Sequence, residues 1–156
     1  MKRQFFFIIW VLVGMMVFGV ADSSAQKKKK MMKELHVTAL QDLKWEQAKD
    51  APPGFMTATV WGNPEKGAYG GYVKFPAGLK FPLHYHTNDS KDIVISGMIT
   101  VVGEDGKKFE FGAGAFAEVP EGWRHTTEVG PEGATVFEWS TKKSGMKMVE
   151  EKPMEK

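Results

Sequence analysis

The amino-acid sequence predicts an all-β domain built as a jelly roll, a barrel of two packed antiparallel sheets. Seventeen glycines and eight prolines lie singly or in pairs between short runs rich in Val, Ile, Phe and Thr, a pattern typical of short strands joined by tight turns. About eight such strands in roughly 100 residues need two packed sheets or a closed barrel to avoid exposed edges. A chain of 156 residues is long enough for one domain with its own hydrophobic core.

The first 25 residues have the form of a secretory signal peptide. Lys2 and Arg3 precede an uninterrupted apolar run over 5–21, and the small residues Ser23 and Ala25 follow it. We expect cleavage after Ala25 and a periplasmic or secreted protein. Without cleavage, the apolar run of 17 residues is almost long enough to anchor the chain in the inner membrane.

Residues 26–34 are predicted to be a solvated basic linker, with adhesion to anionic lipid as the alternative. The lysines at 27–30 and 33 place more positive charge after the apolar run than before it. This arrangement opposes export, because basic residues tend to stay on the cytoplasmic side of a membrane. Translation from Met31 or Met32 would remove the leader and leave a cytoplasmic protein.

The charge of the remaining chain argues against a nucleic-acid partner. The first 33 residues hold seven of the 21 basic and one of the 19 acidic side chains, so the rest has 14 basic and 18 acidic ones, a net charge of −4. The chain has no cysteine, which excludes a disulfide, a thiolate metal ligand and a cysteine nucleophile. Any metal site must therefore use His, carboxylate or water.

The predicted β domain spans residues 35–141. Residues 35–50 are expected to form an edge strand and a short helical turn before the Pro52-Pro53-Gly54 break. The strands expected after it are 57–61, 71–75, 83–86, 92–102, 108–111, 115–119, 125–129 and 134–141. Residues 142–156 are predicted to be a polar, solvated tail.

Turn chemistry separates the later strands. The stretches GEDGKK, at 103–108, and GPEG, at 130–133, are both predicted to be hairpin turns. In the last strand, polar and apolar residues alternate, as in a half-buried sheet. We expect four large side chains to belong to the core: Met98, Phe116, Trp123 and Trp139.

Two of the four histidines stand one residue apart, in the stretch HYH. In a strand, residues i and i+2 project from the same face, so His84 and His86 point together while Tyr85 points away. Two imidazoles make a weak metal site, and a third ligand must come from elsewhere in the fold. His125 is the candidate, because the strand that follows the Pro-Glu-Gly turn carries Trp123 and His125 on one face.

These stretches match two sequence motifs. The first has Gly, then His-x-His, a carboxylate position and Gly at the spacing of Gly78, His84, His86, Ser90 and Gly97. The second follows Gly114, Pro120, Gly122 and His125, with Val129 where an Asn is expected. The chain thus resembles the cupin superfamily, and in particular small single-domain bacterial cupins that lack the glutamate of the first motif. The resemblance implies a cupin barrel, or double-stranded β-helix, with a metal among inward-facing histidines.

Ser90 departs from the cupin pattern, since the family usually offers a carboxylate at this position. Asp92 shares its strand parity and Asp89 is its neighbour, so either can supply an oxygen after a small change of register. A three-histidine site with water at the open positions needs neither carboxylate, and some cupin-like dioxygenases are built that way. The alternative is a degenerate cupin whose histidines only line a pocket.

The predicted metal ligands are His84, His86 and His125, and the predicted ion is divalent Fe, Mn, Ni, Cu or Zn. The leading hypothesis is a metal-dependent enzyme, with dioxygenation first and isomerisation or hydrolysis next, acting on a small oxygenated organic molecule. The alternative is a non-catalytic module that binds or senses a small ligand. Four further side chains are candidates for contacting a substrate: Tyr72, Tyr85, Glu118 and Arg124. A homodimer is expected only because many cupins dimerise.

Overall fold

The computed structural model describes residues 35–150. The predicted signal peptide, the basic linker and the alternative start sites all lie outside the described residues, as do the last six residues of the predicted tail. The contacts within the chain divide it into two units, of which the first ends at His36. The compact unit described below begins at Val37. Within the described residues, no helix has the length and apolar character needed to cross a membrane.

The prediction of an all-β domain is confirmed. A short 3-10 helix, η1, and a two-residue edge strand occupy the region where the sequence predicts a helical turn and an edge strand. The elements are η1 Leu40–Asp42, β1 Glu46–Gln47, β2 Met56–Gly62, β3 Tyr69–Phe75, β4 Lys80–His86, β5 Ser90–Gly103, β6 Lys108–Gly112, β7 Phe116–Val119, β8 His125–Ser140 and β9 Met146–Met148.

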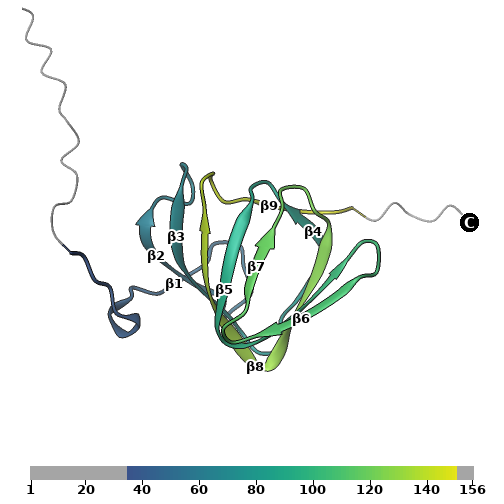
Figure 1. Ribbon diagram of the computed structural model, residues 1–156, viewed down its shortest axis with the longest axis horizontal. Helices are drawn as coiled ribbons and strands as arrows, with labels where there is room; N and C mark the ends of the chain where they lie inside the picture. Colours follow the sequence, from purple (N-terminus) through teal and green to yellow (C-terminus); the bar gives the residue numbers. More distant parts are fainter. Residues whose placement is uncertain (1–34, 151–156) are drawn as a thin grey trace, which may run out of the picture. The chain divides into compact units, whose positions relative to one another are not determined.

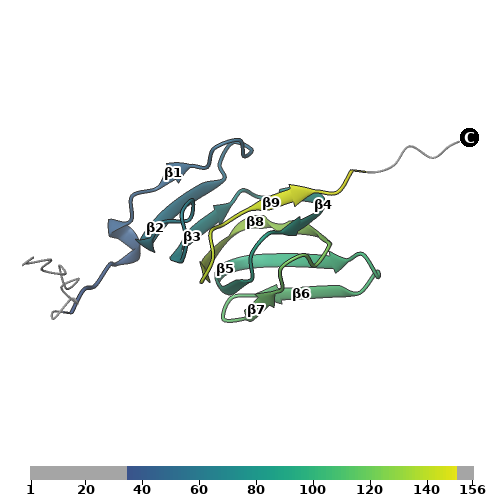
Figure 2. The ribbon, with the colours of Figure 1, turned by 90° about the horizontal axis from the view of Figure 1, so that it is seen from above.

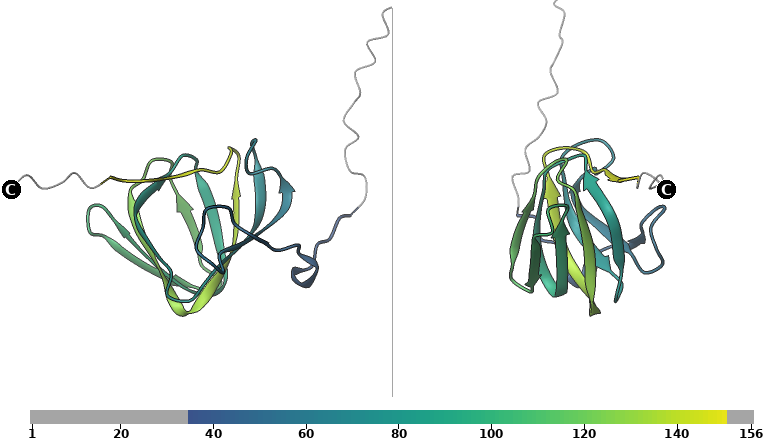
Figure 3. Two further views of the ribbon diagram at one scale, coloured as in Figure 1. Left: turned by 180° about the vertical axis from the view of Figure 1, so that it is seen from behind. Right: turned by 90° about the vertical axis from the view of Figure 1, so that its right-hand side faces the viewer.

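All pairing between these strands is antiparallel, and β5 and β8 form the centre of the domain (Figure 1). On its second edge, β8 pairs first with β4 and then with β3, while β5 pairs first with β7 and then with β6. Seen from above, β6 and β7 lie on one side of this central pair, and β4 and β9 lie on the other (Figure 2). The resulting layers face each other across the interior (Figure 3), as in a double-stranded β-helix.

The predicted hairpin at 130–133 is wrong, and the reason is a bend within one strand. Val129 pairs with Ile99 and Ala134 pairs with Gly97, so four residues of β8 lie opposite a single residue of β5. Such an insertion bends a strand without reversing it. The chain therefore continues as one strand over His125–Ser140 and changes its neighbour from β4 to β3 at the bend.

The other predicted turn, at 103–108, is confirmed as the hairpin between β5 and β6. Val102 pairs with Lys108, and the N–H of Gly103 donates to the carbonyl of Lys107 at 2.9 Å. The predicted solvated tail needs correction, because Met146–Met148 form β9 and pair with β4. All three side chains of β9 are exposed, so backbone pairing alone makes this a strand, and the polar pattern of the tail does not reveal it.

The core lies on the inner face of the bent strands. Six apolar side chains form it: Val94, Ile99, Val101, Val129, Ala134 and Val136. Trp123 packs against this cluster, as expected, but Met98 and Phe116 are 49% and 58% exposed, so the prediction that they belong to the core is wrong. Phe116 pairs with Ile93 and lies 6.1 Å from the ring of Trp139, on the opposite face of the sheet from Val94 and Val136.

A glycine substitution tests the bend. Gly97 has a φ of +84°, and an added Cβ would lie 2.0 Å from the carbonyl oxygen of Gly133; Gly106 has a φ of +80° but open space around it. Gly106→Ala should cost about 1–2 kcal/mol of unfolding free energy, for the backbone conformation alone. Gly97→Ala should cost about 2 kcal/mol more, since the backbone must also move. Urea unfolding measures both variants, and equal losses would contradict a tightly packed bend.

Candidate metal centre

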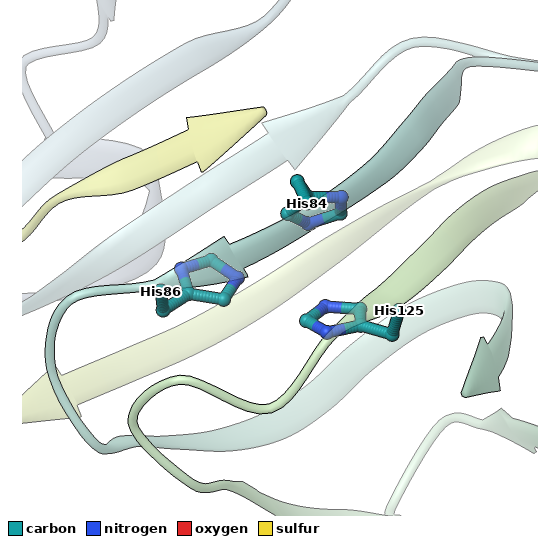
Figure 4. A group of neighbouring side chains, drawn as sticks. All are labelled: His84, His86 and His125. Atoms are coloured by element: carbon teal, nitrogen blue, oxygen red, sulfur yellow. The ribbon is translucent and has the colours of Figure 1, made fainter. Parts of the chain in front are cut away.

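Three imidazole rings meet where β4 and β8 lie side by side. His84 and His86 come from β4, and His125 is the first residue of β8 and the register partner of His84. The ring centroids are 4.3 Å apart for His84 and His125, 5.4 Å for His84 and His86, and 5.5 Å for His86 and His125. Figure 4 shows the three rings converging on one region of space.

Local structure explains how the two segments come together. The alternation of β4 places His84 and His86 on one face, as predicted. The turn before β8 closes through a hydrogen bond from the N–H of Trp123 to the carbonyl of Pro120, at 3.2 Å. The N–H of Gly122 then donates to the carbonyl of His86 at 2.9 Å. The turn is thereby fixed against β4, and His125 emerges beside the paired histidines.

Backbone carbonyl groups set the tautomers of two rings. Nδ1 of His84 lies 2.7 Å from the carbonyl oxygen of Pro82, and Nδ1 of His125 lies 3.0 Å from that of Trp123. A carbonyl oxygen can only accept, so each Nδ1 carries the proton and each Nε2 keeps a free lone pair. This is the arrangement of histidines that bind a metal through Nε2.

Proline has a part in this arrangement. Pro82 has no N–H to donate, and the pairing of β4 with β8 is irregular between Phe81 and His84, the interval that contains it. The carbonyl oxygen of Pro82 instead accepts the hydrogen bond from His84. A local interruption of the ladder therefore supplies the partner that orients one of the three imidazoles.

The three histidines are uncharged at neutral pH. Burial lowers the pKa of His84 and of His125, and in both it outweighs the backbone hydrogen bond that favours the protonated ring. Burial also lowers the pKa of His86 to about 4, with a further contribution from repulsion by the other two rings. Only a neutral imidazole has a lone pair for a metal.

The cluster fits a divalent transition metal. Its potential ligand atoms all lie within 4.8 Å of one another. Imidazole nitrogens that share one ion at about 2.0–2.1 Å lie about 3–4 Å apart, so small rotations of the rings suffice. Donor type, protonation and spacing therefore all meet the needs of a metal site. His36, the fourth histidine, is not part of this group.

No carboxylate among residues 35–150 joins the three histidines. Ser90 is buried, and neither candidate for replacing the family glutamate takes that role. Oδ1 of Asp89 accepts a hydrogen bond from the N–H of Glu121 at 2.9 Å. Asp92 pairs across the sheet with Glu138. The cluster thus consists of three neutral ligands.

Aromatic side chains surround the histidines. The indole of Trp123 stacks on His125, with centroids 4.8 Å apart and planes 18° apart, and Phe81 lies 5.6 Å from His84. Both Trp123 and His125 therefore face inward, as predicted.

Three of the four predicted candidates for contacting a substrate have side-chain partners away from the histidines, and Tyr85 lies on the opposite face of β4 from His84 and His86. Tyr72 packs on Phe137, with centroids 4.9 Å apart, and Tyr85 pairs with Lys147 on β9. Arg124 forms an ion pair with Glu104 at 3.1 Å. Glu118 forms another, with Lys91, at the same distance.

Sequence reasoning missed two polar residues of the interior, Tyr69 and Glu138. The hydroxyl of Tyr69, a buried residue, donates to Oε1 of Glu138. The available signal was the alternation of the last strand, which places Glu138 on the same face as the core residue Val136. A carboxylate at an inward position of a strand is unusual and indicates a specific role.

The fold is similar to solved cupin structures. The polyketide cyclase RemF from Streptomyces resistomycificus has a TM-score of 0.62 at 17% identity, over 77% of this chain and 89% of that chain. The Cnp3 cupin domain from Schizosaccharomyces pombe has a TM-score of 0.54 at 19% identity, over 67% and 72%. The DMSP lyase DddQ from Ruegeria pomeroyi has a TM-score of 0.55 at 16% identity, over 70% and 62%. At these identities the similarity establishes the fold alone.

Sequence comparison identifies the family. No curated protein sequence matches the chain. The family model of the ChrR cupin-like domain matches residues 33–143, which is most of the chain and includes both histidine segments. Together with the barrel and its inward-facing histidines, this match shows that the chain belongs to the ChrR cupin-like family of the cupin superfamily.

Proposed function

We propose that this protein is a metal-dependent enzyme that acts on a small oxygenated organic molecule inside the barrel. One observation carries the proposal: three uncharged imidazoles converge, and no carboxylate among the described residues joins them. Three neutral ligands leave the full positive charge on a divalent ion and leave positions open for a substrate.

In this proposal, His84, His86 and His125 hold the ion, which can be divalent Fe, Mn, Ni, Cu or Zn. A bound ion would polarise a carbonyl, enol or carboxylate group of the substrate, and iron would add reactivity towards O₂. The carbonyl groups of Pro82 and Trp123 keep two rings in the ligating tautomer. Trp123 and Phe81 exclude water from the rings that they cover.

Dioxygenation is the reaction that we propose first, followed by isomerisation or hydrolysis. Two structural neighbours support a catalytic role, because they are described as a polyketide cyclase and a DMSP lyase. A protein of this family that only binds or senses a small ligand would use the same three histidines without turnover.

Removal of two ligands tests the metal site. His84→Ala combined with His86→Ala should reduce the bound metal to background, because a single imidazole cannot hold a divalent ion against the buffer. The β-sheet circular dichroism should stay largely intact. Elemental analysis of the purified variant measures the loss. His36→Ala is the matched control and should keep the metal; unchanged metal in the double variant would disprove the ligand assignment.

The pKa values predict how metal binding depends on pH. The folded protein keeps its histidines neutral below the ordinary imidazole pKa of about 6.5, so metal binding should persist as pH falls through that value. It should be lost as pH approaches the pKa of His86, about 4. NMR titration of the imidazole protons in metal-free protein, with metal retention measured at each pH, checks both statements. A midpoint near 6.5 for His86 would contradict the role of burial.

Turnover separates the enzyme from the binding module. Iron-loaded protein should consume O₂ in the presence of a diketone or a phenolic acid, and the double histidine variant should consume none. An oxygen electrode and product analysis by mass spectrometry measure the reaction. Bound metal without turnover on any compound of this kind, by oxygen uptake or by isomerisation or hydrolysis, would instead support a ligand-binding module.

A further inference from the structure

A second polar cluster lies on the inner face of the barrel, formed by two carboxyl groups. Asp92 on β5 and Glu138 on β8 are register partners, directly opposite each other in the central pair of strands. The next inward pair along the same strands is Val94 and Val136, which belong to the hydrophobic core. The two carboxyl groups, called the carboxyl pair below, therefore continue the core face.

The carboxyl pair is held by hydroxyl groups and is not fully satisfied. Tyr69 donates to Oε1 of Glu138, and the hydroxyl of Ser90, two residues before Asp92 on β5, lowers the pKa of the Asp92 carboxyl group. Oδ1 of Asp92 is shut off from solvent and has no hydrogen-bond partner among the described residues. A buried polar atom without a partner is costly, and in native proteins it indicates a function or a missing ligand.

No cation compensates the carboxyl pair within the described part of the chain. The groups that affect the two carboxyls electrostatically are each other and Tyr69. The nearby basic side chains are engaged elsewhere: Lys91 with Glu118, Lys74 over the ring of Trp45, and Lys142 with Glu121.

Two adjacent carboxylates cannot both ionise in such a place. Burial raises the pKa of Asp92 and of Glu138, and their mutual repulsion raises that of Asp92 further. Both effects favour keeping one proton on the pair as the pH rises.

The carboxyl pair and the histidines face one interior. Val129 lies four residues after His125 on the same face of β8. It belongs to the same core cluster as Val136, which lies two residues before Glu138 on the inner face. Because β8 bends at residues 130–133, its two ends rise on opposite walls of the barrel (Figure 1).

Chain length limits the separation of the two clusters. Only three residues connect His86 to Ser90, so their Cα atoms lie at most about 14 Å apart. Asp92 lies two residues after Ser90 on the same face of β5. This limit keeps the carboxyl pair in the same part of the barrel as the imidazoles.

We propose that Asp92 and Glu138 share one proton and are the acid–base groups of the barrel interior, acting on a carbonyl compound that lies between them and the histidines. The ionised carboxyl takes a proton from the carbon next to the carbonyl group, and the electron pair of that C–H bond moves into the substrate. The protonated partner returns a proton to another atom of the substrate. The result is an isomer, so no oxidant or reductant is needed.

This inference rests on the proposed metal site and narrows its chemistry to reactions that need proton transfer. It gives a reason for placing two acidic side chains opposite each other on the inner face of the central strands, next to the core residues Val94 and Val136.

The first test measures protonation without metal or substrate. In metal-free protein with ¹³C-labelled Asp and Glu carboxyls, NMR should detect a pair that retains one proton at neutral pH. Asp92→Asn should lower the pKa of Glu138, and Glu138→Gln should lower that of Asp92, since each removes a repelling neighbour. Two fully ionised carboxylates would overturn the proposal. A shift of both signals on adding Ca²⁺ in the double histidine variant would also overturn it, by making the pair a cation site.

The second test measures proton transfer. In D₂O, the metal-loaded protein should exchange the C–H protons next to the carbonyl group of at least one member of a panel of small ketones, 2-oxo acids and hydroxyketones, followed by ¹H NMR. Asp92→Asn and Glu138→Gln should each slow this exchange by about 100-fold while keeping the metal. Asp89→Asn, the same chemical change on the adjacent turn, should exchange like the wild type.

The outcomes separate the two proposals. If the Asp92 and Glu138 variants exchange as fast as the wild type while the double histidine variant does not, the carboxyl pair has no acid–base role and the metal site stands. If the double histidine variant keeps its metal and its exchange, the metal site is wrong. No exchange with any compound overturns the acid–base proposal. Tyr69→Phe is a second variant for the case that the carboxyl substitutions prevent folding. It keeps the ring and removes the hydroxyl that donates to Glu138, so it should change the pKa of the carboxyl pair.

Discussion

The pairing of β5 with β8 is the constraint on which the rest of the structure depends. These strands run antiparallel over most of their length and bend at shared irregularities, where β8 carries extra residues at 130–133. Because the pairing persists through the bend, each strand contributes to two walls, and the shorter strands attach to its free edges. The positions of His125 at one end of β8 and Glu138 near the other follow from this geometry.

Burial favours the uncharged form in both polar clusters, which lowers the pKa of the histidines and raises the pKa of the carboxyl groups. It removes the proton from a base, so the imidazoles of His84, His86 and His125 are neutral. It keeps a proton on an acid, so the carboxyl pair of Asp92 and Glu138 resists full ionisation. The same low polarity of the interior therefore prepares one group to bind a cation and the other to exchange a proton.

Strand parity and turn chemistry predicted much of this structure. The His-x-His pattern placed His84 and His86 on one face, and the motif around His125 identified the third ring. The prediction of a hairpin at 130–133 was wrong because the glycines there indicate a change of chain direction. They do not indicate whether the partner strand bends together with β8. The strand β9 and the pairing of Asp92 with Glu138 could not be predicted, because both depend on register between segments distant in sequence.

The small strand β9 lies along the edge of β4 that β8 leaves free. Its register partners on β4 are His84, Tyr85 and His86, and the N–H of Val149 donates to the carbonyl of Leu83 at 2.9 Å. Ahead of β9, the N–H of Gly145 donates to Oδ1 of the buried Asn88 at 3.1 Å. The strand that carries two imidazoles is thus clamped by backbone contacts with exposed residues near the end of the chain. Loss of the pairing between β9 and β4 would make β4 more mobile without removing any core side chain. An affinity tag placed next to β9 would therefore endanger the histidine site, and tags belong elsewhere.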